Sequence, residues 1–227
     1  MVKWKGIELS TKGIIVEKTP SIMKGKKRFE KYEIEGRNGV LVIDKGTYDS
    51  FVVTLECHFD ISKYSIEEIK DFLDGYGTLS FDGKKEYTAI IQNQIEFEKV
   101  SMFRKFPIQF LVNPICTDIN STVLEVESNN YEINIEEATA NMYPLLIIKG
   151  SGDVSITFNN KTFYLYELNQ DNTYYLDCEN KVIYDTNNVN CSHLMRYDFP
   201  YLKPKTNTIS YTGTITLFEI EYKKAYI

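Results

Sequence analysis

Apolar and polar residues alternate along most of this chain, in short runs that are separated by turn-forming residues. The clearest runs are 51–59 and 103–112. Successive side chains of a strand point to opposite faces of a sheet, so a two-residue period predicts a strand with one buried face. In the first run that face consists of Phe51, Val53, Leu55, Cys57 and Phe59. Further runs of this kind lie at 28–35, 77–81, 86–91 and 95–98.

The segment 65–75 departs from this period and predicts an α-helix. Ser65 is suited to cap the helix while Glu68, three residues later, reaches back to the same end. Gly75 favours the left-handed conformation that ends many helices. The apolar residues follow the helical period and predict one buried face, formed by Ile66, Ile69, Phe72 and Leu73. We expect this helix to lie on a sheet.

The pattern changes near residue 114, where Asn113 and Pro114 are expected to end the first block of strands. The polar segment 117–121 has the composition of a linker. We therefore predict two domains, residues 1–121 and residues 122–227.

The second domain is predicted to contain strands only, at the spacing of a β-sandwich. Asn159 and Asn160 form a two-residue hairpin signal between two strands. Gly150, Ser151 and Gly152 are expected to form a tight turn. The predicted strands lie at 143–148, 154–158, 161–166, 173–178, 181–184, 206–211 and 214–222.

Composition and charge narrow the functional classes. The 227 residues include 26 Lys and Arg against 32 Asp and Glu, a formal net charge of −6, which disfavours nucleic-acid binding as the main activity. The strongest positive run is Lys24, Lys26, Lys27 and Arg28, which we interpret as a solvated loop. The sequence predicts neither a membrane-spanning segment nor a signal peptide, and we expect synthesis in a reducing cytoplasm.

The residues that usually carry catalysis or bind metals form no recognisable set. The two histidines, His58 and His193, are far apart and are interpreted as structural. The sequence contains no metal-spaced cysteine pair and no nucleophile motif. We predict no catalytic, metal-binding or cofactor-binding residues and no enzymatic activity; binding residues are not identified. The four cysteines are expected to be free, buried thiols: Cys57, Cys116, Cys178 and Cys191.

β-Sandwiches often bind sugars, typically by laying an aromatic ring against the apolar face of the sugar. Trp4, the one tryptophan, belongs to the first domain. The second domain would have to use tyrosines such as Tyr174, Tyr175 or Tyr201, which we expect to close its core or rim. Sugar recognition in the manner of galectins is therefore not expected.

The order of motifs along the chain resembles that of the distal tail proteins (Dit) of long-tailed phages that infect Gram-positive bacteria. In the first half the resemblance rests on 35–41, Gly46-Thr47-Tyr48, the strand 51–59, the single helix, 76–81, 87–89 and 106–114. In the second half it rests on 143–152, Tyr175-Leu176-Asp177-Cys178 and 199–209. One departure is Lys205, which stands where the family often has glycine in a late turn.

The resemblance implies a mainly β protein, with an N-terminal split β-barrel that carries one α-helix and a C-terminal galectin-like β-sandwich. It implies a structural component of the virion tail tip, in which the first domain forms a homo-hexameric ring. The implied partners are the tail tube protein, the tape-measure protein and a tail-associated fibre or lysin protein, with DNA only in transit. Within the ring, the Lys24–Lys27 loop is expected to face carboxylates such as Glu67 or Glu68 of the adjacent copy.

The leading hypothesis is therefore a structural hub that joins the tail tube to the adsorption apparatus. The alternative is a carbohydrate-binding module that contributes to adsorption on host cell-wall carbohydrate through residues 122–227. A third hypothesis, a cell-wall hydrolase, lacks an identifiable acid–base pair or metal set.

Overall fold

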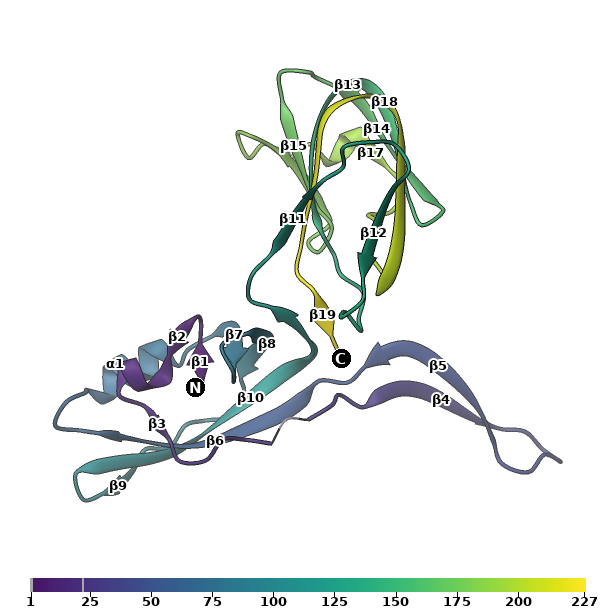
Figure 1. Cartoon of the computed structure of the whole chain (residues 1–227). Coiled ribbons are helices and arrows are strands. Elements are labelled where there is room, and N and C mark those ends of the chain that lie inside the picture. Colours follow the sequence, from purple (N-terminus) through teal and green to yellow (C-terminus); the bar gives the residue numbers. More distant parts are fainter. Residues whose placement is uncertain (1, 22) are drawn as a thin grey trace. The chain divides into compact units, whose positions relative to one another are not determined.

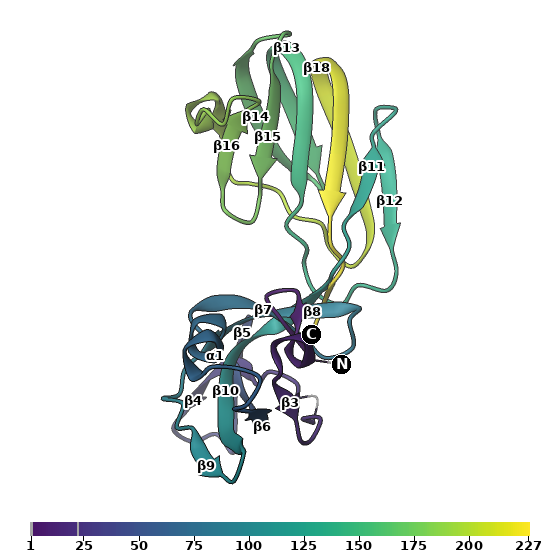
Figure 2. The ribbon, with the colours of Figure 1, turned by 90° about the vertical axis from the view of Figure 1, so that its left-hand side faces the viewer.

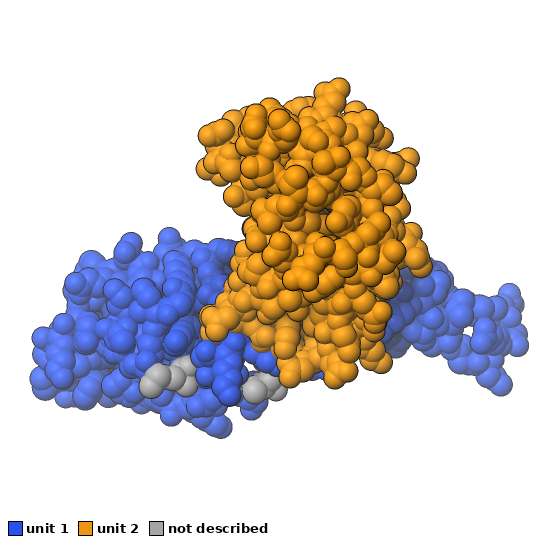
Figure 3. Space-filling view, turned by 45° about the horizontal axis from the view of Figure 1, so that its top comes forward, with its two compact units in different colours: residues 1–117, 227 blue, residues 118–226 orange. Residues whose placement is uncertain are grey.

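A computed structural model describes residues 2–21 and 23–227; Met1 and Ile22, both in the predicted first domain, lie outside the described residues. The chain forms two compact units, coloured separately in Figure 3. Unit 1 comprises residues 1–117 with Ile227, and unit 2 comprises residues 118–226.

Unit 1 is built on an antiparallel sheet that curls into a half-barrel, as Figure 1 shows. The strand order is β2-β1-β7-β8-β10-β6-β3, and β9 pairs with β10. The sheet therefore has open edges at β2 and β3, which is the geometry of a split barrel. Its strands are β1 (Lys3–Trp4), β2 (Ile7–Glu8), β3 (Ile15–Val16), β6 (Phe51–Asp60), β7 (Tyr76–Ser80), β8 (Lys85–Ile91), β9 (Glu98–Val100) and β10 (Phe103–Asp118).

The core of unit 1 lies inside this curl and uses the predicted faces of β6 and β10. Phe110 of β10 pairs with Val53 of β6 and contacts Trp4, whose ring centroid is 4.9 Å away. A short 3-10 helix, η1 (Leu9–Lys12), contributes Leu9 to the same core. The alternation in the sequence thus identified the main buried layer of the unit.

The helix α1 (Ile66–Phe72) begins as predicted, and both halves of its capping box are formed. The Glu68 backbone N–H donates to Ser65 Oγ, and the Ser65 N–H donates to Glu68 Oε2. Ile69 and Leu73 are buried against the sheet. Gly75 has φ +75°, as expected, but the helix already ends at Phe72, with Leu73 as its C-cap at φ −86°.

Strands β4 (Lys27–Glu33) and β5 (Val40–Tyr48) form a separate two-stranded sheet, which projects from the half-barrel in Figure 1. In register, Tyr32 lies opposite Leu41, and Glu30 lies opposite Ile43. All but two of the side chains of these strands are exposed on both faces of the hairpin. The hairpin therefore contributes little to the core of its own chain.

Unit 2 is a β-sandwich whose two longest strands, β13 and β18, run side by side through both layers (Figure 2). The first part of β13 pairs with β15, whereas its second part pairs with β14. Similarly, β18 pairs with β12 near its start and with β11 near its end. The elements are β11 (Thr122–Glu125), β12 (Tyr131–Ile135), β13 (Leu145–Phe158), β14 (Lys161–Leu168), β15 (Thr173–Asp177), β16 (Val182–Asp185), η2 (Ser192–Leu194), β17 (Met195–Arg196), β18 (Lys205–Tyr222) and β19 (Ala225–Tyr226).

The inner faces of both layers supply the core of unit 2. Even-numbered residues of β13 are buried, from Leu146 to Phe158, except at the bulge near Gly152. The hairpin at Asn159 and Asn160 is formed as predicted, with φ of 49° and 69°. The fold class is therefore mainly β, as the sequence indicates, with a half-barrel carrying one α-helix followed by a β-sandwich.

Several predicted boundaries are wrong because strands continue through apparent breaks. The strand β10 runs on through Asn113 and Pro114; its pairing with β6 ends at Val112, so no β6 carbonyl needs the N–H that Pro114 lacks. Gly150–Gly152 is not a turn but a bulged part of β13. The predicted strands 206–211 and 214–222 form one strand, β18. The strand predicted at 95–98 is wrong for another reason, since the structure has β9 at 98–100 instead.

Candidate functional site

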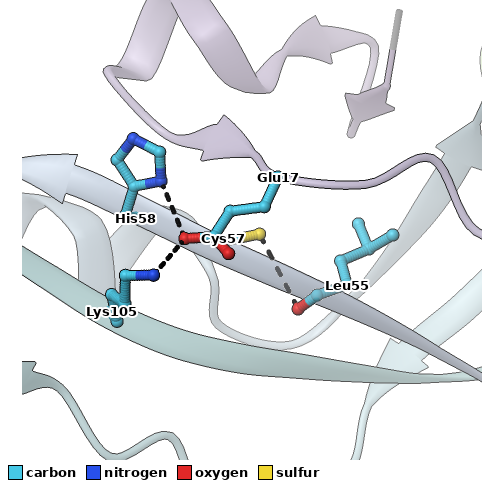
Figure 4. Close-up of polar contacts among 5 residues, drawn as sticks. All are labelled: Glu17, Leu55, Cys57, His58 and Lys105. Carbon is cyan, nitrogen blue, oxygen red and sulfur yellow. Dashed lines mark hydrogen bonds and ion pairs between the residues drawn. The ribbon is translucent and has the colours of Figure 1, made fainter.

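The chain's closest approach to a catalytic arrangement is the cluster of Glu17, His58 and Lys105 on the outer face of the half-barrel (Figure 4). His58 of β6 lies opposite Lys105 of β10, and Glu17 follows β3, the neighbouring strand. Glu17 Oε1 is 2.8 Å from Lys105 Nζ and 3.2 Å from His58 Nδ1. A hydrogen bond from Lys105 holds the pKa of Glu17 below its ordinary value. The cluster therefore fastens β3 to the sheet.

Cys57, the neighbour of His58, does not complete a thiol–imidazole pair. Its side chain lies on the opposite face of β6, in the core, and its Sγ donates to the Leu55 carbonyl at 3.8 Å. Burial raises the pKa of the Cys57 thiol to about 12. Because the thiolate is the nucleophilic form, this cysteine is a packing residue.

The other residues singled out in the sequence do not converge on one site. The four cysteines are buried and form no disulfide, and burial raises the pKa of the Cys178 thiol as well. Within residues 2–21 and 23–227, no group of three or more His, Cys, Asp or Glu side chains could hold a metal ion. Trp4 is fully buried, Tyr174 is buried, and Tyr175 stacks on Tyr184 with ring centroids 5.3 Å apart.

Two of the charged residues assigned to the ring interface, Lys27 and Glu68, have partners within their own chain. Lys27 pairs with Asp44, and Arg28 Nε is 2.5 Å from Asp49 Oδ1. Glu68 is engaged in the capping box of α1. These contacts stabilise local structure in unit 1.

The strongest candidate interface is the β4–β5 hairpin, which exposes apolar side chains on both faces. Tyr32, Leu41 and Ile43 share one face and are 46, 38 and 47% exposed. Phe29, Val40 and Val42 share the other face and are 41, 42 and 52% exposed. Contiguous exposed apolar surface of this kind typically marks a protein interaction site.

Ion pairs link the two strands of this hairpin. Lys45 Nζ of β5 lies 2.5 Å from Glu30 Oε1 of β4, and Lys27 pairs across the strands with Asp44. The pKa of Glu30 is lowered mainly by the hydrogen bond from Lys45. Both ion pairs are solvent-exposed and contribute little stability, and the apolar side chains of the hairpin stay accessible.

Sequence reasoning identified β4 but missed β5 and the hairpin. The feature that could have revealed β5 is the uninterrupted run Val40-Leu41-Val42-Ile43, which places apolar residues on both faces of one strand. Such a run ordinarily indicates a fully buried strand. Here it belongs to an exposed ribbon.

The architecture, a half-barrel with a projecting hairpin followed by a β-sandwich, has a counterpart among solved structures. The crystal structure of SPP1 Dit (gp 19.1), described as a paradigm of the hub adsorption apparatus in phages that infect Gram-positive bacteria, matches it with a TM-score of 0.76. The match covers 100% of this chain and 98% of that chain at 11% sequence identity. The resemblance to the distal tail proteins is therefore confirmed at the level of the fold.

Sequence comparisons add no further relatives. No protein family's sequence profile matches the chain, and no curated protein matches it. Among the described residues, no helix is both long and apolar enough to cross a membrane.

Proposed function

We propose that this chain is a distal tail protein that forms a ring-shaped hub at the tail tip of a phage or a prophage-derived particle. The β4–β5 hairpin is the single observation that carries this proposal. A two-stranded hairpin is marginally stable in water unless it packs against something else. This hairpin keeps six large apolar side chains exposed, so a second protein surface is needed to cover them.

A second copy of the chain is the partner that best explains an arm of this kind. When the arm of one copy packs on a different surface of the next, the contact is head-to-tail. Such contacts generate a closed ring if the rotation between copies completes a circle. The fold shared with SPP1 Dit, the described hub protein, supports this assembly. We propose a hexamer formed through unit 1, with the galectin-like unit 2 monomeric by itself.

The hub would join the tail tube to the adsorption apparatus. Its proposed partners are the tail tube protein, the tape-measure protein and a tail-associated fibre or lysin protein, after synthesis in the host cytoplasm. DNA would pass through the ring in transit, and a net charge of −6 favours passage over retention. The role is structural rather than enzymatic.

Light scattering on the full chain over a range of concentrations tests the proposal, because assembly follows mass action. The expected result is a single oligomer with the mass of a closed ring, visible as rings by negative-stain microscopy. Open filaments of increasing length would contradict closure. A monomeric mass at every concentration, with the chain folded, would contradict self-assembly through the hairpin.

A further inference from the structure

A tyrosine-lined hollow in unit 2 has no role in the proposed ring. It has a volume of about 970 Å³ and lies at the edge of the sandwich, where β14 pairs with β17. Arg196 of β17 lines the hollow, and the residue opposite Arg196 on β14 is Tyr164, which lies beside the hollow. The polar and aromatic side chains that line the hollow are Asp153, Tyr166, Glu167, His193, Arg196 and Tyr197.

Three tyrosines form an aromatic surface beside this hollow. Phe163 and Leu165 of β14 point into the core, so Tyr164 and Tyr166 point outward. The rings of Tyr164 and Tyr166 are stacked, with centroids 6.1 Å apart and an interplanar angle of 9°. The ring of Tyr197 lies 5.7 Å from that of Tyr164. Tyr166 is 38% exposed and Tyr197 is 76% exposed, so ring faces remain available to a ligand.

The backbone beside the tyrosines is held in an uncommon conformation. Tyr197 has φ +76° and Glu167 has φ +57°, values that bulky residues rarely adopt. The Glu167 N–H donates to Asp153 Oδ1 at 3.1 Å, which fixes the bulge at that position. Backbone strain of this kind is concentrated at binding sites, where the fold has to hold a side chain in one place.

The polar groups of the hollow carry both signs of charge. Arg196 Nη1 donates to the carbonyl oxygens of His193 and Met195, each at 3.2 Å, so the guanidinium is oriented. A guanidinium has five N–H groups, which leaves donors for a ligand. Asp153 and Glu167 supply carboxylate acceptors. This mixture suits a ligand with many hydroxyl groups, which donate and accept at once.

A second hollow, of about 760 Å³, adjoins the first and shares Tyr197 with it. It is lined by Tyr143, which is 52% exposed, and by Tyr201. Their ring centroids are 6.2 Å apart, and Lys161 Nζ lies 5.3 Å from the Tyr201 ring centroid. Two hollows on either side of one exposed ring fit a chain-like ligand better than a single small molecule.

We propose that these two hollows form a binding groove for a neutral polysaccharide, with Tyr197 as its central stacking platform. The C–H faces of sugar rings pack on tyrosine rings, and sugar hydroxyls pair with Arg196, Asp153 and Glu167. A polyanion such as teichoic acid fits poorly, because two carboxylates oppose one guanidinium in the first hollow. An extended peptide fits poorly as well, because the edge strand β17 has only two residues to pair with it.

This inference goes beyond the hub role, and it revises the expectation that the tyrosines of this domain serve only its core or rim. That expectation holds for Tyr174, which is buried. Tyr197, which is 76% exposed, was not among the tyrosines considered from the sequence, because the strand pattern did not place it beside β14.

The test is calorimetric titration of the full-length chain with soluble oligosaccharide tetramers, of N-acetylglucosamine and of glucose, and with glycerol teichoic acid. We expect saturable binding of at least one neutral tetramer, in the millimolar range or tighter. Tyr197→Ala and Tyr166→Ala should each weaken it about tenfold, whereas Tyr197→Phe should retain it. Tyr184→Ala, in the stacked pair with Tyr175, is the matched control and should have no effect.

The proposal is overturned if neither neutral tetramer binds, or if Tyr197→Ala and Tyr184→Ala behave alike. Binding of teichoic acid alone would also overturn it, since the ligand would then be a polyanion. A variant with Leu41→Ser and Ile43→Ser in the hairpin separates this inference from the ring. That variant should lose self-association and keep sugar binding, so either function can fail without the other.

Discussion

Glu17 makes the cluster on the outer face of unit 1 sensitive to pH. Its folded-state pKa is lowered, chiefly by the hydrogen bond from Lys105, so the ionised form is favoured in the folded chain. A group of this type stabilises the fold above its unfolded pKa, and the contribution is lost as pH falls through the folded pKa.

Glu17→Gln should therefore lower the free energy of unfolding near neutral pH. Below the unfolded pKa of about 4.5 the difference from the wild type should shrink as the pH decreases. Urea unfolding of both proteins from about pH 7 to about pH 3 measures this difference. A gap that stays constant over that range would show that Glu17 acts through packing rather than charge.

Asn207 is a polar residue whose side chain holds the turn at residues 203–205 of unit 2 through hydrogen bonds. It is fully buried, and its Oδ1 accepts from the Lys203 N–H at 2.8 Å and from Asn159 Nδ2 at 2.7 Å. Its Nδ2 donates to the carbonyls of Lys203 and Lys205. Lys205 itself has φ +71°, the conformation that the glycine usual at this position in distal tail proteins adopts readily.

Asn207→Ala should destabilise the chain by about 2–4 kcal/mol, because it leaves several buried backbone groups without partners. Chemical denaturation measures the loss. Asn134→Ala is the control, since Asn134 bonds only the exposed Glu136 among the hydrogen bonds described, and it should change stability by less than about 0.5 kcal/mol. Equal effects of the two substitutions would contradict the role given to Asn207.

At the scale of elements, the corner shared by β13 and β18 holds the sandwich together. Both strands shift register here, at Gly150 and again near Gly152, and pass from one layer to the other. A Cβ placed on Gly150 would lie 2.4 Å from the Thr214 carbonyl oxygen. One on Gly213 would lie 2.5 Å from the Asp153 carbonyl oxygen. Glycine is required because two backbones approach closely.

Gly150→Ala should therefore cost about 2–4 kcal/mol, since a backbone carbonyl cannot move aside without disturbing the strand pair. Gly152→Ala is the matched control: it has open space but φ +69°, and it should cost about 1–2 kcal/mol. Thermal and denaturant unfolding of both variants decide the comparison. If Gly152→Ala lowers the free energy of unfolding more than Gly150→Ala does, the close approach of the two backbones is not the reason that glycine is required at position 150.

Local signals in the sequence predicted the elements whose causes are local. The faces of β6 and β10 follow from alternation, the start of α1 from Ser65 and Glu68, and the β13–β14 hairpin from its two asparagines. The continuity of β13 and β18 was not predictable, because glycines that ordinarily mark turns are here selected by a neighbouring strand.

The candidate sites were less predictable, because they too depend on contacts outside the local sequence. The outward direction of Tyr164 and Tyr166 follows from the alternation in β14, but their proximity to Tyr197 depends on pairing with β17, about thirty residues later in the chain. The hairpin β4–β5 was missed because both of its faces are apolar and exposed. Its composition fits the proposed contact with a second copy of the chain.

At the scale of the whole molecule, we propose that the hairpin joins copies of the chain. Its ion pairs link the two strands, and its apolar side chains are exposed in the single chain. Interfaces commonly depend on a few large buried residues. We expect Leu41 and Ile43, which share a face with Tyr32, to belong to that set.

The most direct test is the mass of the full-length chain by native mass spectrometry, for the wild type and for a variant with Leu41→Ser and Ile43→Ser. Val123→Ser is the control, because Val123 is an apolar residue on β11 of unit 2 that is 54% exposed, against 38 and 47% for Leu41 and Ile43. We predict a closed oligomer, a hexamer, for the wild type and the control, and a folded monomer for the hairpin variant at the same concentration. A hairpin variant that assembles as fully as the wild type would contradict the account.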